Sequence, residues 1–296
     1  MTAPSGTEIL IAGATSALGR ATLALCRERG HRVRALARSE SRLQSVDADE
    51  RIARDITNAT EIGAAVRGID TVFSCAGQSV GPDSSNRGPG YHAVDFTGNR
   101  NLLEAAKRAG VRRFVYISVF RAADFPEVAY LKAHAAVERL IRDSGLSHAL
   151  IQPTGFFSVF DALFDMARRN RAVKFGDGGS RTNPIADADL AEICADAIDA
   201  AGNAEIPAGG PAIHTRHEIL ELAFAALGRP AKIRRMPAWT PSLMGTVAQP
   251  FAPRLGELMK FVRVIGEHDF VAPAHGNRTL EGYFRSLAGD GPASRR

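Results

Sequence analysis

A glycine-rich segment near the N-terminus has the residue types and spacing of a phosphate-binding turn. The apolar run Ile9–Ala12 leads directly into the sequence GATSALG, residues 13–19, and an apolar helical pattern follows. Small residues at such a turn let the backbone approach a pyrophosphate at the positive end of the helix. Ser16 replaces the middle glycine of the three-glycine motif, so the flanking strand and helix carry the prediction, with a plain strand-to-helix turn as the alternative. The residues expected to line the pyrophosphate are Gly13, Thr15, Ser16, Ala17, Leu18 and Gly19.

The residues after the second predicted strand indicate which dinucleotide binds. A site specific for NAD places an acidic residue there, where it binds the ribose hydroxyls. This chain instead has Ala37-Arg38-Ser39, followed by Arg42. A guanidinium offers a planar set of donors to a 2′-phosphate, and no carboxylate repels the anion. The sequence therefore favours NADP(H) over NAD, and an ordinary surface charge at Arg38 is the alternative.

An alternation of strands and helices must position these segments. The helical patterns Leu18–Arg29 and Asn99–Ala109 each stop before a glycine, a common helix-ending residue. Short β-branched runs predict strands at Ile9–Ala12, Arg32–Ala37, Arg51–Ala53, Thr71–Ser74, Arg113–Ile117 and Ser147–Gln152. This alternation is typical of an α/β fold with a doubly wound parallel sheet of Rossmann type.

The second half of the chain is less regular. Its predicted elements are a helix at Val159–Arg169, a strand at Ala172–Phe175, and helices at Ala188–Ala201 and Ile219–Leu227, the last with capping-box spacing between Thr215 and Glu218. We expect residues 1–155 to form an NAD(P)-binding Rossmann domain. Residues 156–296 would contribute late Rossmann elements and a small C-terminal lobe on the substrate side. Core packing is expected for the large apolar residues of the tail, with the lining of an apolar pocket as the alternative: Trp239, Phe251, Phe261 and Phe270.

The glycine- and proline-rich segment Gly77–Gly90 is expected to be a surface loop rather than regular structure. Its position after the fourth predicted strand puts it at the carboxyl edge of the sheet, where open parallel sheets bind ligands. Both a lid and a simple connection are compatible with this position. At the end of the chain, residues 288–296 are expected to fray.

Several segments together resemble the atypical short-chain dehydrogenases of the NmrA-like, NAD(P)H-binding group. They are IAGATSALGR, VRALARSESRL, VDFTGNRNLLEAAKRAGVRRFVYISV, SGLSHALIQPTGFF and NPIADADLAEI, spanning residues 9 to about 193. The resemblance implies a Rossmann fold and a nicotinamide cofactor. It also implies positions around that cofactor: Asp55 and Ile56 near the adenine, Ala76 and Gly77 after the fourth strand, and Pro153, Gly155 and Phe156 beside the nicotinamide.

The catalytic signature of that group is a serine after the fifth strand and Tyr-x-x-x-Lys on the next helix. Here Ser118 follows the strand and Tyr130 comes twelve residues later, but the fourth residue after Tyr130 is His134. Positions four apart share one helix face, so His134 can reach the region below Tyr130, whereas Lys132 points away. The family's lysine position is therefore occupied by a histidine.

The histidine leaves three interpretations open. A permanent ammonium would lower the pKa of the phenol from about 10, and a histidine, largely neutral near pH 7, does this less well. Either His134 substitutes for the lysine, or another residue supplies the acid, or the site has lost redox chemistry. Ser118 as a strand-end residue and Tyr130 as a packing aromatic are the structural alternatives.

Composition and residue spacing argue against several other classes of protein: membrane-spanning, secreted, nucleic-acid-binding and metal-binding. The 296 residues are 45% hydrophobic, but no apolar run approaches the roughly 20 residues of a membrane span, and the N-terminus lacks a signal pattern. We therefore expect a cytoplasmic protein. The net charge of +5 comes without a basic run, which argues against nucleic-acid binding. No metal site is expected, because neither the cysteines nor the Asp and His pairs have ligand spacing: Cys26, Cys75, Cys194, Asp187, Asp189, His214 and His217.

The sequence thus predicts an NADP(H)-dependent oxidoreductase that transfers hydride to or from a carbonyl or an activated double bond of a small molecule. Tyr130 would donate the proton, Ser118 would orient the substrate oxygen, and His134 would help position the ribose. A non-catalytic NADP(H)-sensing regulator and an NAD(P)-dependent epimerase or isomerase are the alternatives. The expected partner is a small-molecule substrate, without nucleic acid or membrane.

Overall fold

The computed structural model describes residues 6–78 and 90–289. These residues form two compact units, each described by itself below. The first contains residues 6–78, 90–152 and 190–206, and the second contains residues 153–189 and 207–289. The domain division 1–155 and 156–296 expected from the sequence is retained as a proposal. Most of the segment expected as a loop, residues 79–89, and the last part of the expected frayed terminus, residues 290–296, lie outside the described residues.

A seven-stranded sheet forms the centre of the first unit, with the strand order β3-β2-β1-β4-β5-β6-β9. The strands are β1 (Glu8–Ala12), β2 (Arg32–Ala37), β3 (Glu50–Ala53), β4 (Thr71–Ser74), β5 (Arg113–Ile117), β6 (Ser147–Pro153) and β9 (Ala204–Ala208). The pairs from β3 through β6 are parallel. The order changes direction at β1, between β2 and β4, and this switch point is where open α/β sheets bind ligands. The fold is a Rossmann-type α/β fold, which confirms the sequence prediction.

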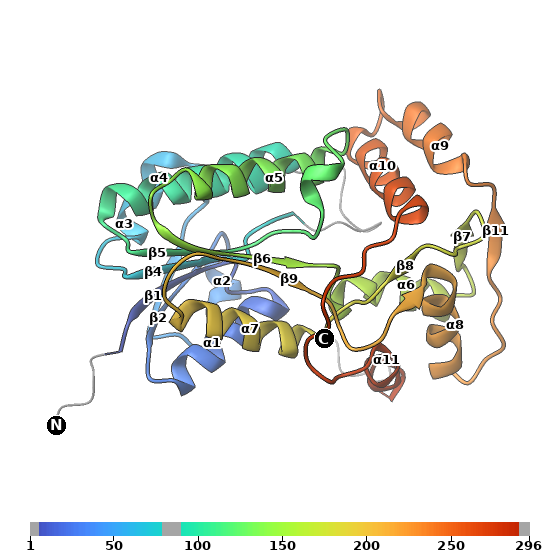
Figure 1. Cartoon of the computed structure of the whole chain (residues 1–296), viewed down its shortest axis with the longest axis horizontal. Helices are drawn as coiled ribbons and strands as arrows, with labels where there is room; N and C mark the ends of the chain where they lie inside the picture. The colour runs from blue at the N-terminus through green and yellow to red at the C-terminus, as the bar shows by residue number, and fades with distance from the viewer. Residues whose placement is uncertain (1–5, 79–89, 290–296) are drawn as a thin grey trace. The chain divides into compact units, whose positions relative to one another are not determined.

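Helices cover both faces of this sheet (Figure 1). Helices α3 (Ala59–Ala65), α4 (Asn99–Ala109) and α5 (Ala129–Arg142) lie along one face, and α1 (Ala17–Glu28) and α7 (Asp187–Asp199) lie along the other. The strands are apolar on both sides because both sides are covered, as in other parallel sheets. In β4 and β5 every residue is buried. The core facing α3, α4 and α5 includes Leu10, Val72, Phe114, Tyr116 and Leu150 from successive strands.

The six strands predicted from the sequence are confirmed within one residue at each end. One element of the first unit was not expected: a π-helix, η1 (His92–Gly98), which runs directly into α4. Gly98 allows its backbone to approach the neighbouring segment, because a Cβ at this position would lie 2.7 Å from Cδ1 of Ile56. Because η1 runs directly into α4, Asn99 lies within a longer helical segment that begins at His92.

The second unit is built mainly of helices. A 3₁₀ turn, η3 (Phe157–Phe160), leads into α6 (Asp161–Arg168), where a single helix at Val159–Arg169 was predicted. Helices α6, α8 (Arg216–Ala226) and α11 (Leu280–Gly289) share one core, which includes Phe164, Phe224 and Phe284. The capping box predicted at Thr215 and Glu218 is present at the start of α8. Two short pairs of strands complete this part: β7 (Val173–Phe175) with β11 (Arg234–Met236), and β8 (Arg181–Thr182) with β10 (His214–Thr215).

The tail of the second unit differs from the sequence prediction. Helices α9 (Thr240–Ala248) and α10 (Pro253–Glu267) pack against each other, and Phe270 is buried as expected. The expectation of core packing is wrong for Trp239 and Phe251, whose side chains are 62% and 85% exposed. Among the described residues, no helix combines the length and the apolar character that crossing a membrane requires.

Candidate functional site

The turn after β1 has a backbone that only glycine fits comfortably. Gly13 has a φ of +90°, and a Cβ at this residue would lie 2.8 Å from the carbonyl oxygen of Cys75, which follows β4. A Cβ at Gly19 would lie 2.3 Å from the carbonyl oxygen of Gly13. The two glycines thus bring the turn and the start of α1 closely together at the switch point of the sheet, which is the form a pyrophosphate-binding turn requires.

Ser16 closes this turn instead of a middle glycine. Its hydroxyl donates to the carbonyl oxygen of Gly13 at 2.9 Å and accepts from the amide of Gly19 at 3.0 Å, so it is the N-cap of α1. The first-turn amides of Ala17 and Leu18 have no acceptor within the helix and point toward its N-terminal end. Ser16 and Ala17 are exposed. The turn therefore fits a phosphate, with small residues outside and helix amides behind them.

At the end of β2, Arg38 is exposed and has no hydrogen-bond or ion-pair partner within the described part of the chain. Arg42, one turn further on in the short helix α2 (Glu40–Leu43), is also exposed. Ser39 caps α2 by accepting from the amide of Arg42 at 3.3 Å. Both guanidinium groups remain available to an anion at the position where the adenosine ribose is expected.

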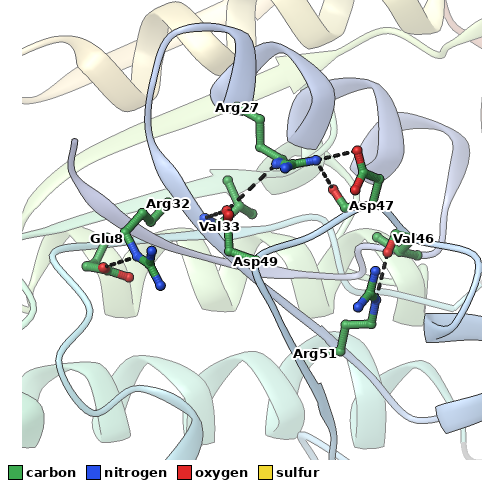
Figure 2. Close-up of polar contacts among 8 residues, drawn as sticks. All are labelled: Glu8, Arg27, Arg32, Val33, Val46, Asp47, Asp49 and Arg51. Carbon is green, nitrogen blue, oxygen red and sulfur yellow. Dashed lines mark hydrogen bonds and ion pairs between the residues drawn. The ribbon is translucent and has the colours of Figure 1, made fainter.

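Charged contacts anchor the crossover from α2 to β3, residues 44–49, that follows these arginines (Figure 2). Arg27 of α1 pairs with Asp47, and its Nε lies 3.7 Å from Oδ2 of Asp49. The same oxygen of Asp49 accepts from the amide of Val33 in β2 at 2.9 Å. The segment carrying Arg38 and Arg42 is thereby held at both of its ends, by β2 and by this crossover.

The two residues expected near the adenine follow β3. Asp55 is half-buried, and its Oδ1 accepts from the amide and the hydroxyl of Thr57, at 2.9 and 2.8 Å. The side chain of Ile56 is buried and packs against Gly98. Ile56 therefore contributes to the core, and contact with a cofactor at this residue would involve its backbone.

A buried polar network after β4 was not predicted from the sequence. The side-chain oxygen of Asn99 accepts from the hydroxyl of Ser74 at 2.6 Å, and its amide donates to the carbonyl oxygens of Ala76 and Asp95 at 3.0 and 2.9 Å. Asn99 thereby fixes the segment that contains Ala76 and Gly77, both expected to line the cofactor. Its signal in the sequence is a polar residue that falls on the buried face of an otherwise amphipathic helix.

Asp95 explains the glycine at position 77. A Cβ at Gly77 would lie 2.7 Å from Oδ1 of Asp95, and this oxygen accepts from the amide of Gln78 at 3.1 Å. Asp95 is fully buried. The carboxylate therefore lies directly against the backbone that follows β4, at the carboxyl edge of the sheet.

Ser118 follows β5, and its amide donates to the carbonyl oxygen of Ile151 in β6 at 2.8 Å. Its side chain is 2% exposed, and its hydroxyl has no hydrogen-bond partner among the described residues. A buried hydroxyl without a partner is costly, which makes it a candidate for binding a ligand oxygen.

Helix α5 places Tyr130 and His134 on one face, as their four-residue spacing predicts. Their ring centroids are 4.8 Å apart in an edge-to-face arrangement, and the ring centroid of Tyr91 lies 5.4 Å from that of Tyr130. Lys132 is exposed, so it does not take part in this cluster. The structure thus brings the predicted tyrosine and histidine together and leaves the nearest lysine in solvent.

Both nitrogens of the His134 ring face side chains of the first unit. Nδ1 lies 2.8 Å from the hydroxyl of Tyr116 in β5, and Nε2 lies 3.7 Å from Oδ1 of Asp95. Burial lowers the pKa of His134 to about 3, so the imidazole is neutral near pH 7. We assign its proton to Nε2, facing the carboxylate, with the Tyr116 hydroxyl donating to Nδ1.

The same surroundings raise the pKa values of the tyrosines. Burial is the main cause for Tyr130, and the negative charges of Asp95 and of a Tyr91 phenolate add to it. Burial and Asp95 likewise raise the pKa of Tyr116. Both phenols therefore stay protonated at neutral pH. This is the opposite of the effect that a lysine ammonium would have on the phenol.

The three residues expected beside the nicotinamide belong to the second unit. Gly155 has a φ of +146°, and its carbonyl oxygen accepts from the amide of Ile185 at 2.9 Å. Pro153 is buried and Phe156 is half-buried. They form one ordered turn, which η3 follows.

Asp187 and Asp189, which lack metal-ligand spacing in the sequence, both make side-chain contacts within the second unit. Asp187 accepts from the hydroxyl of Ser158 at 2.7 Å, and Asp189 pairs with Arg278. Within the part of the chain that the structure describes, no three His, Cys, Asp or Glu residues gather in a way that could hold a metal ion.

Comparison with known proteins identifies the family. A family model described as NAD(P)H-binding matches residues 13–201. The chain belongs to this family. The resemblance inferred from the sequence segments is thereby confirmed at the level of NAD(P)H binding, and the matched range contains the Gly13 turn, Arg38, Ser118 and Tyr130.

Several curated proteins are similar over most of the chain. The divinyl chlorophyllide a 8-vinyl-reductase of Arabidopsis thaliana is 25% identical, covering 98% of this chain and 79% of the relative, and that of Zea mays is 27% identical, covering 98% and 81%. The photosystem II assembly factor Ycf39 of Synechocystis is 25% identical, covering 77% and 70%. The relatives thus include both reductases and an assembly factor.

Solved structures share the fold at lower identity. An NADPH-dependent quinone oxidoreductase of Escherichia coli, in complex with NADPH, has a TM-score of 0.69 at 18% identity, covering 94% of this chain and 99% of its own. A nucleoside-diphosphate-sugar epimerase from Staphylococcus aureus has a TM-score of 0.69 at 17% identity, covering 96% of both chains. These likenesses confirm the Rossmann-type fold.

Proposed function

We propose that the protein is an NADP(H)-dependent reductase that transfers hydride to a conjugated, electron-poor double bond or carbonyl of a small molecule. Membership in an NAD(P)H-binding family supplies the cofactor class. The observation that carries the choice of NADP(H) is Arg38, which is exposed, has no partner among the described residues, and directly follows β2 where an NAD-specific site has an acidic residue.

The Gly13 turn and Arg38 would hold the two ends of the adenosine diphosphate part of the cofactor. The turn supplies close backbone approach and the first-turn amides of α1 for the pyrophosphate. Arg38, with Arg42 beside it, supplies guanidinium donors for the 2′-phosphate. When bound, the nicotinamide would supply the hydride.

Tyr130 would serve as the proton donor. Its pKa lies above the ordinary value of 10, so the phenol is protonated throughout the neutral range. A protonated phenol can donate to a substrate that gains a hydride, which is the direction stated in the names of the reductase relatives. Ser118, whose buried hydroxyl lacks a partner among the described residues, would orient the substrate oxygen.

For His134 we propose a positioning role in place of the predicted contact with the ribose. Its Nδ1 faces Tyr116 and its Nε2 faces Asp95, while its ring packs edge to face with Tyr130. A neutral, buried imidazole cannot lower the pKa of the phenol as an ammonium would, but it can fix the rotamer of Tyr130. This proposal differs from the three interpretations left open by the sequence: Tyr130 would still donate the proton, and no residue would take the place of the lysine.

The substrate class rests on the relatives. The names of two similar proteins state an 8-vinyl group of a chlorophyllide and a quinone as their substrates. Both are conjugated acceptors. We therefore propose an acceptor of this kind, and the cytoplasm as the location, although the plant relatives are described as chloroplastic.

The first test compares the binding of NADPH and NADH by calorimetry. Wild type should bind NADPH more tightly than NADH. Arg38→Ala should lower the affinity for NADPH roughly tenfold, the effect of losing one charge-assisted contact, and should leave the affinity for NADH unchanged. Arg108→Ala removes an exposed arginine of α4 away from the turn and serves as the matched control. Equal affinities for both nucleotides, unaffected by Arg38→Ala, would reject the NADP(H) assignment.

The second test measures turnover on quinones, enones and simple carbonyls with NADPH. Tyr130→Phe should lower kcat by a factor of about 10² or more, typical of a lost general acid, without changing NADPH affinity. Tight NADPH binding without hydride transfer to any of these acceptors would count against a reductase.

A non-catalytic NADP(H) sensor is the second candidate, and the observation that favours it is the absence of an ammonium beside Tyr130 among the described residues. Such a protein would capture a partner protein in only one cofactor state. An epimerase or isomerase, the third candidate, would instead show substrate turnover without net consumption of NADPH.

A further inference from the structure

The hairpin of α9 and α10 in the second unit exposes an unusual set of large apolar side chains. Six of them are exposed, from 40% for Met244 and Leu255 to 85% for Phe251. We call this set the α9 surface: Trp239, Leu243, Met244, Val247, Phe251 and Leu255. Core packing was predicted for Trp239 and Phe251, and packing within the second unit does not account for their exposure.

Helix α9 is amphipathic in the reverse sense. Its buried residues are small or polar, namely Thr240, Pro241 and Gly245, whereas Leu243, Met244 and Val247 are exposed. A helix of a soluble domain normally turns its large apolar residues toward the core. The outward face of α9 therefore has the composition of a face that contacts something other than water.

The packing of α9 on α10 fixes this orientation. Gly245 of α9 approaches Gly256 of α10 so closely that a Cβ at Gly245 would lie 3.3 Å from the carbonyl oxygen of Gly256. A Cβ at Gly256 would lie 2.3 Å from Oε1 of Gln249. Because the small residues form the contact between the helices, the large side chains of α9 remain on the opposite side.

The chain segment that carries the α9 surface is basic, and the first acidic residue after it is Glu257. From Arg229 to Gly256 the sequence contains five basic residues and no acidic one: Arg229, Lys232, Arg234, Arg235 and Arg254. Lys232, Arg234 and Arg235 are exposed just before α9. A second copy of the chain would place this positive charge against itself in a symmetric dimer, which opposes self-association through this face. An anionic partner is complementary to it.

We propose that the α9 surface docks on an anionic lipid bilayer, with α9 lying in the plane of the interface. Trp, Phe, Leu, Met and Val side chains on an uncharged helix, flanked by Lys and Arg, are typical of helices that insert into the boundary between head groups and acyl chains. Nearby basic residues add attraction to anionic lipids. The absence of a spanning helix among the described residues is compatible with this arrangement, because an interfacial helix does not cross the bilayer. The proposal departs from the sequence prediction, which expected no membrane partner, and it does not depend on the proposed function.

The test is sedimentation of the full chain with vesicles of phosphatidylcholine alone and of phosphatidylcholine with phosphatidylserine at a ratio of about 7:3. Wild type should bind the anionic vesicles, and Trp239→Ser with Phe251→Ser should reduce the bound fraction at least about fivefold, since two large apolar groups no longer insert. Ile213→Ser is the matched control, because Ile213 is 53% exposed and lies outside the α9 surface. An unchanged melting temperature will establish that each variant is folded.

The contribution of the basic residues to membrane binding is tested separately. Lys232→Gln with Arg234→Gln should also reduce binding to the anionic vesicles, whereas Arg171→Gln, another exposed basic residue of the second unit, should not. Failure of wild type to bind anionic vesicles would overturn the proposal. So would a dimer in light scattering that Trp239→Ser with Phe251→Ser converts to a monomer, because the surface would then be an interface between two copies.

Discussion

The hydroxyl of Tyr116 in β5 lies 2.8 Å from Nδ1 of His134 in α5, and both residues are buried. The other ring nitrogen, Nε2, faces Asp95, whose carboxylate also accepts from the amide of Gln78 in the segment after β4. The position four residues after Tyr130 is therefore part of the interior of the first unit. We propose that His134 holds the helix that carries Tyr130, and this relationship leads to the first two predictions.

Stability should fall in mild acid because His134 is buried in its neutral form. Its folded-state pKa is about 3, whereas an unfolded histidine has a pKa of about 6.5. Below pH 6.5 the unfolded chain therefore binds a proton that the folded chain does not. His134 alone should lower the free energy of unfolding by about 2 kcal/mol at pH 5 relative to pH 7.5. Above about pH 7.5 this contribution is nearly constant, because the unfolded histidine is then neutral as well.

Urea unfolding of wild type and His134→Gln at both pH values checks this prediction. The variant loses the hydrogen bond with Tyr116 at either pH, so the informative quantity is the difference between the two pH values. This difference should be smaller in the variant by about 2 kcal/mol. Equal differences in the two proteins would show that His134 is not the titrating group.

The Tyr116 hydroxyl should stabilise the first unit by its contact with His134. Tyr116→Phe leaves Nδ1 of a buried ring without its partner, and we expect a loss of about 1–3 kcal/mol in the free energy of unfolding. In a His134→Leu background the same substitution should cost about 1 kcal/mol less, because no acceptor remains. A double-mutant cycle by chemical denaturation measures this coupling. Additive effects would contradict a direct contact.

The sequence was informative where one local rule decides the structure. Strands β1, β4 and β5 are apolar runs ended by turn residues, and Gly13 is required by the turn itself, so both could be predicted. The network of Asn99, Asp95 and Ser74 could not, because the π-helix η1 shifts the phase of the helical pattern before α4. Hydrophobic type alone predicted burial for Trp239 and Phe251, yet the small residues Gly245 and Gly256 occupy the contact between α9 and α10 instead.

Two glycines with similar backbone angles allow the cost of backbone strain to be measured apart from the cost of a steric clash at Cβ. Gly13 and Gly30 have φ values of +90° and +85°, but only Gly13 has neighbouring atoms where a Cβ would lie. Gly30→Ala should cost about 1–2 kcal/mol from strain alone. Gly13→Ala should cost more, because the carbonyl of Cys75 must also move, and it should weaken NADPH binding about tenfold or more.

Thermal unfolding and NADPH titration of the two variants check this contrast. Gly30→Ala is the control, since it tests the same region of backbone space away from the turn. If Gly13→Ala left NADPH affinity at the level of the control, the Gly13 turn would not be the pyrophosphate site.

The crossover after α2 should influence the choice between NADPH and NADH without touching either. Asp49 accepts from the amide of Val33 in β2 and faces the guanidinium of Arg27, so Asp49→Ala removes one contact of the crossover with β2 and one with α1 (Figure 2). The lost hydrogen bond should lower the free energy of unfolding by about 1–2 kcal/mol. Because Arg38 and Arg42 precede this crossover, NADPH affinity should fall about threefold while NADH affinity stays unchanged.

Glu8→Ala is the matched control for that prediction. Glu8 and Arg32 form an ion pair at 2.9 Å in the same region, but both side chains are exposed (Figure 2). Exposed pairs of this kind contribute about 0–1 kcal/mol, so this variant should unfold nearly as wild type does and keep the same ratio of NADPH to NADH affinity. Calorimetric titration of both variants with both nucleotides measures the ratio. If Asp49→Ala destabilised the chain but left that ratio unchanged, the crossover would stabilise the fold alone, and Arg38 would be positioned entirely by the end of β2.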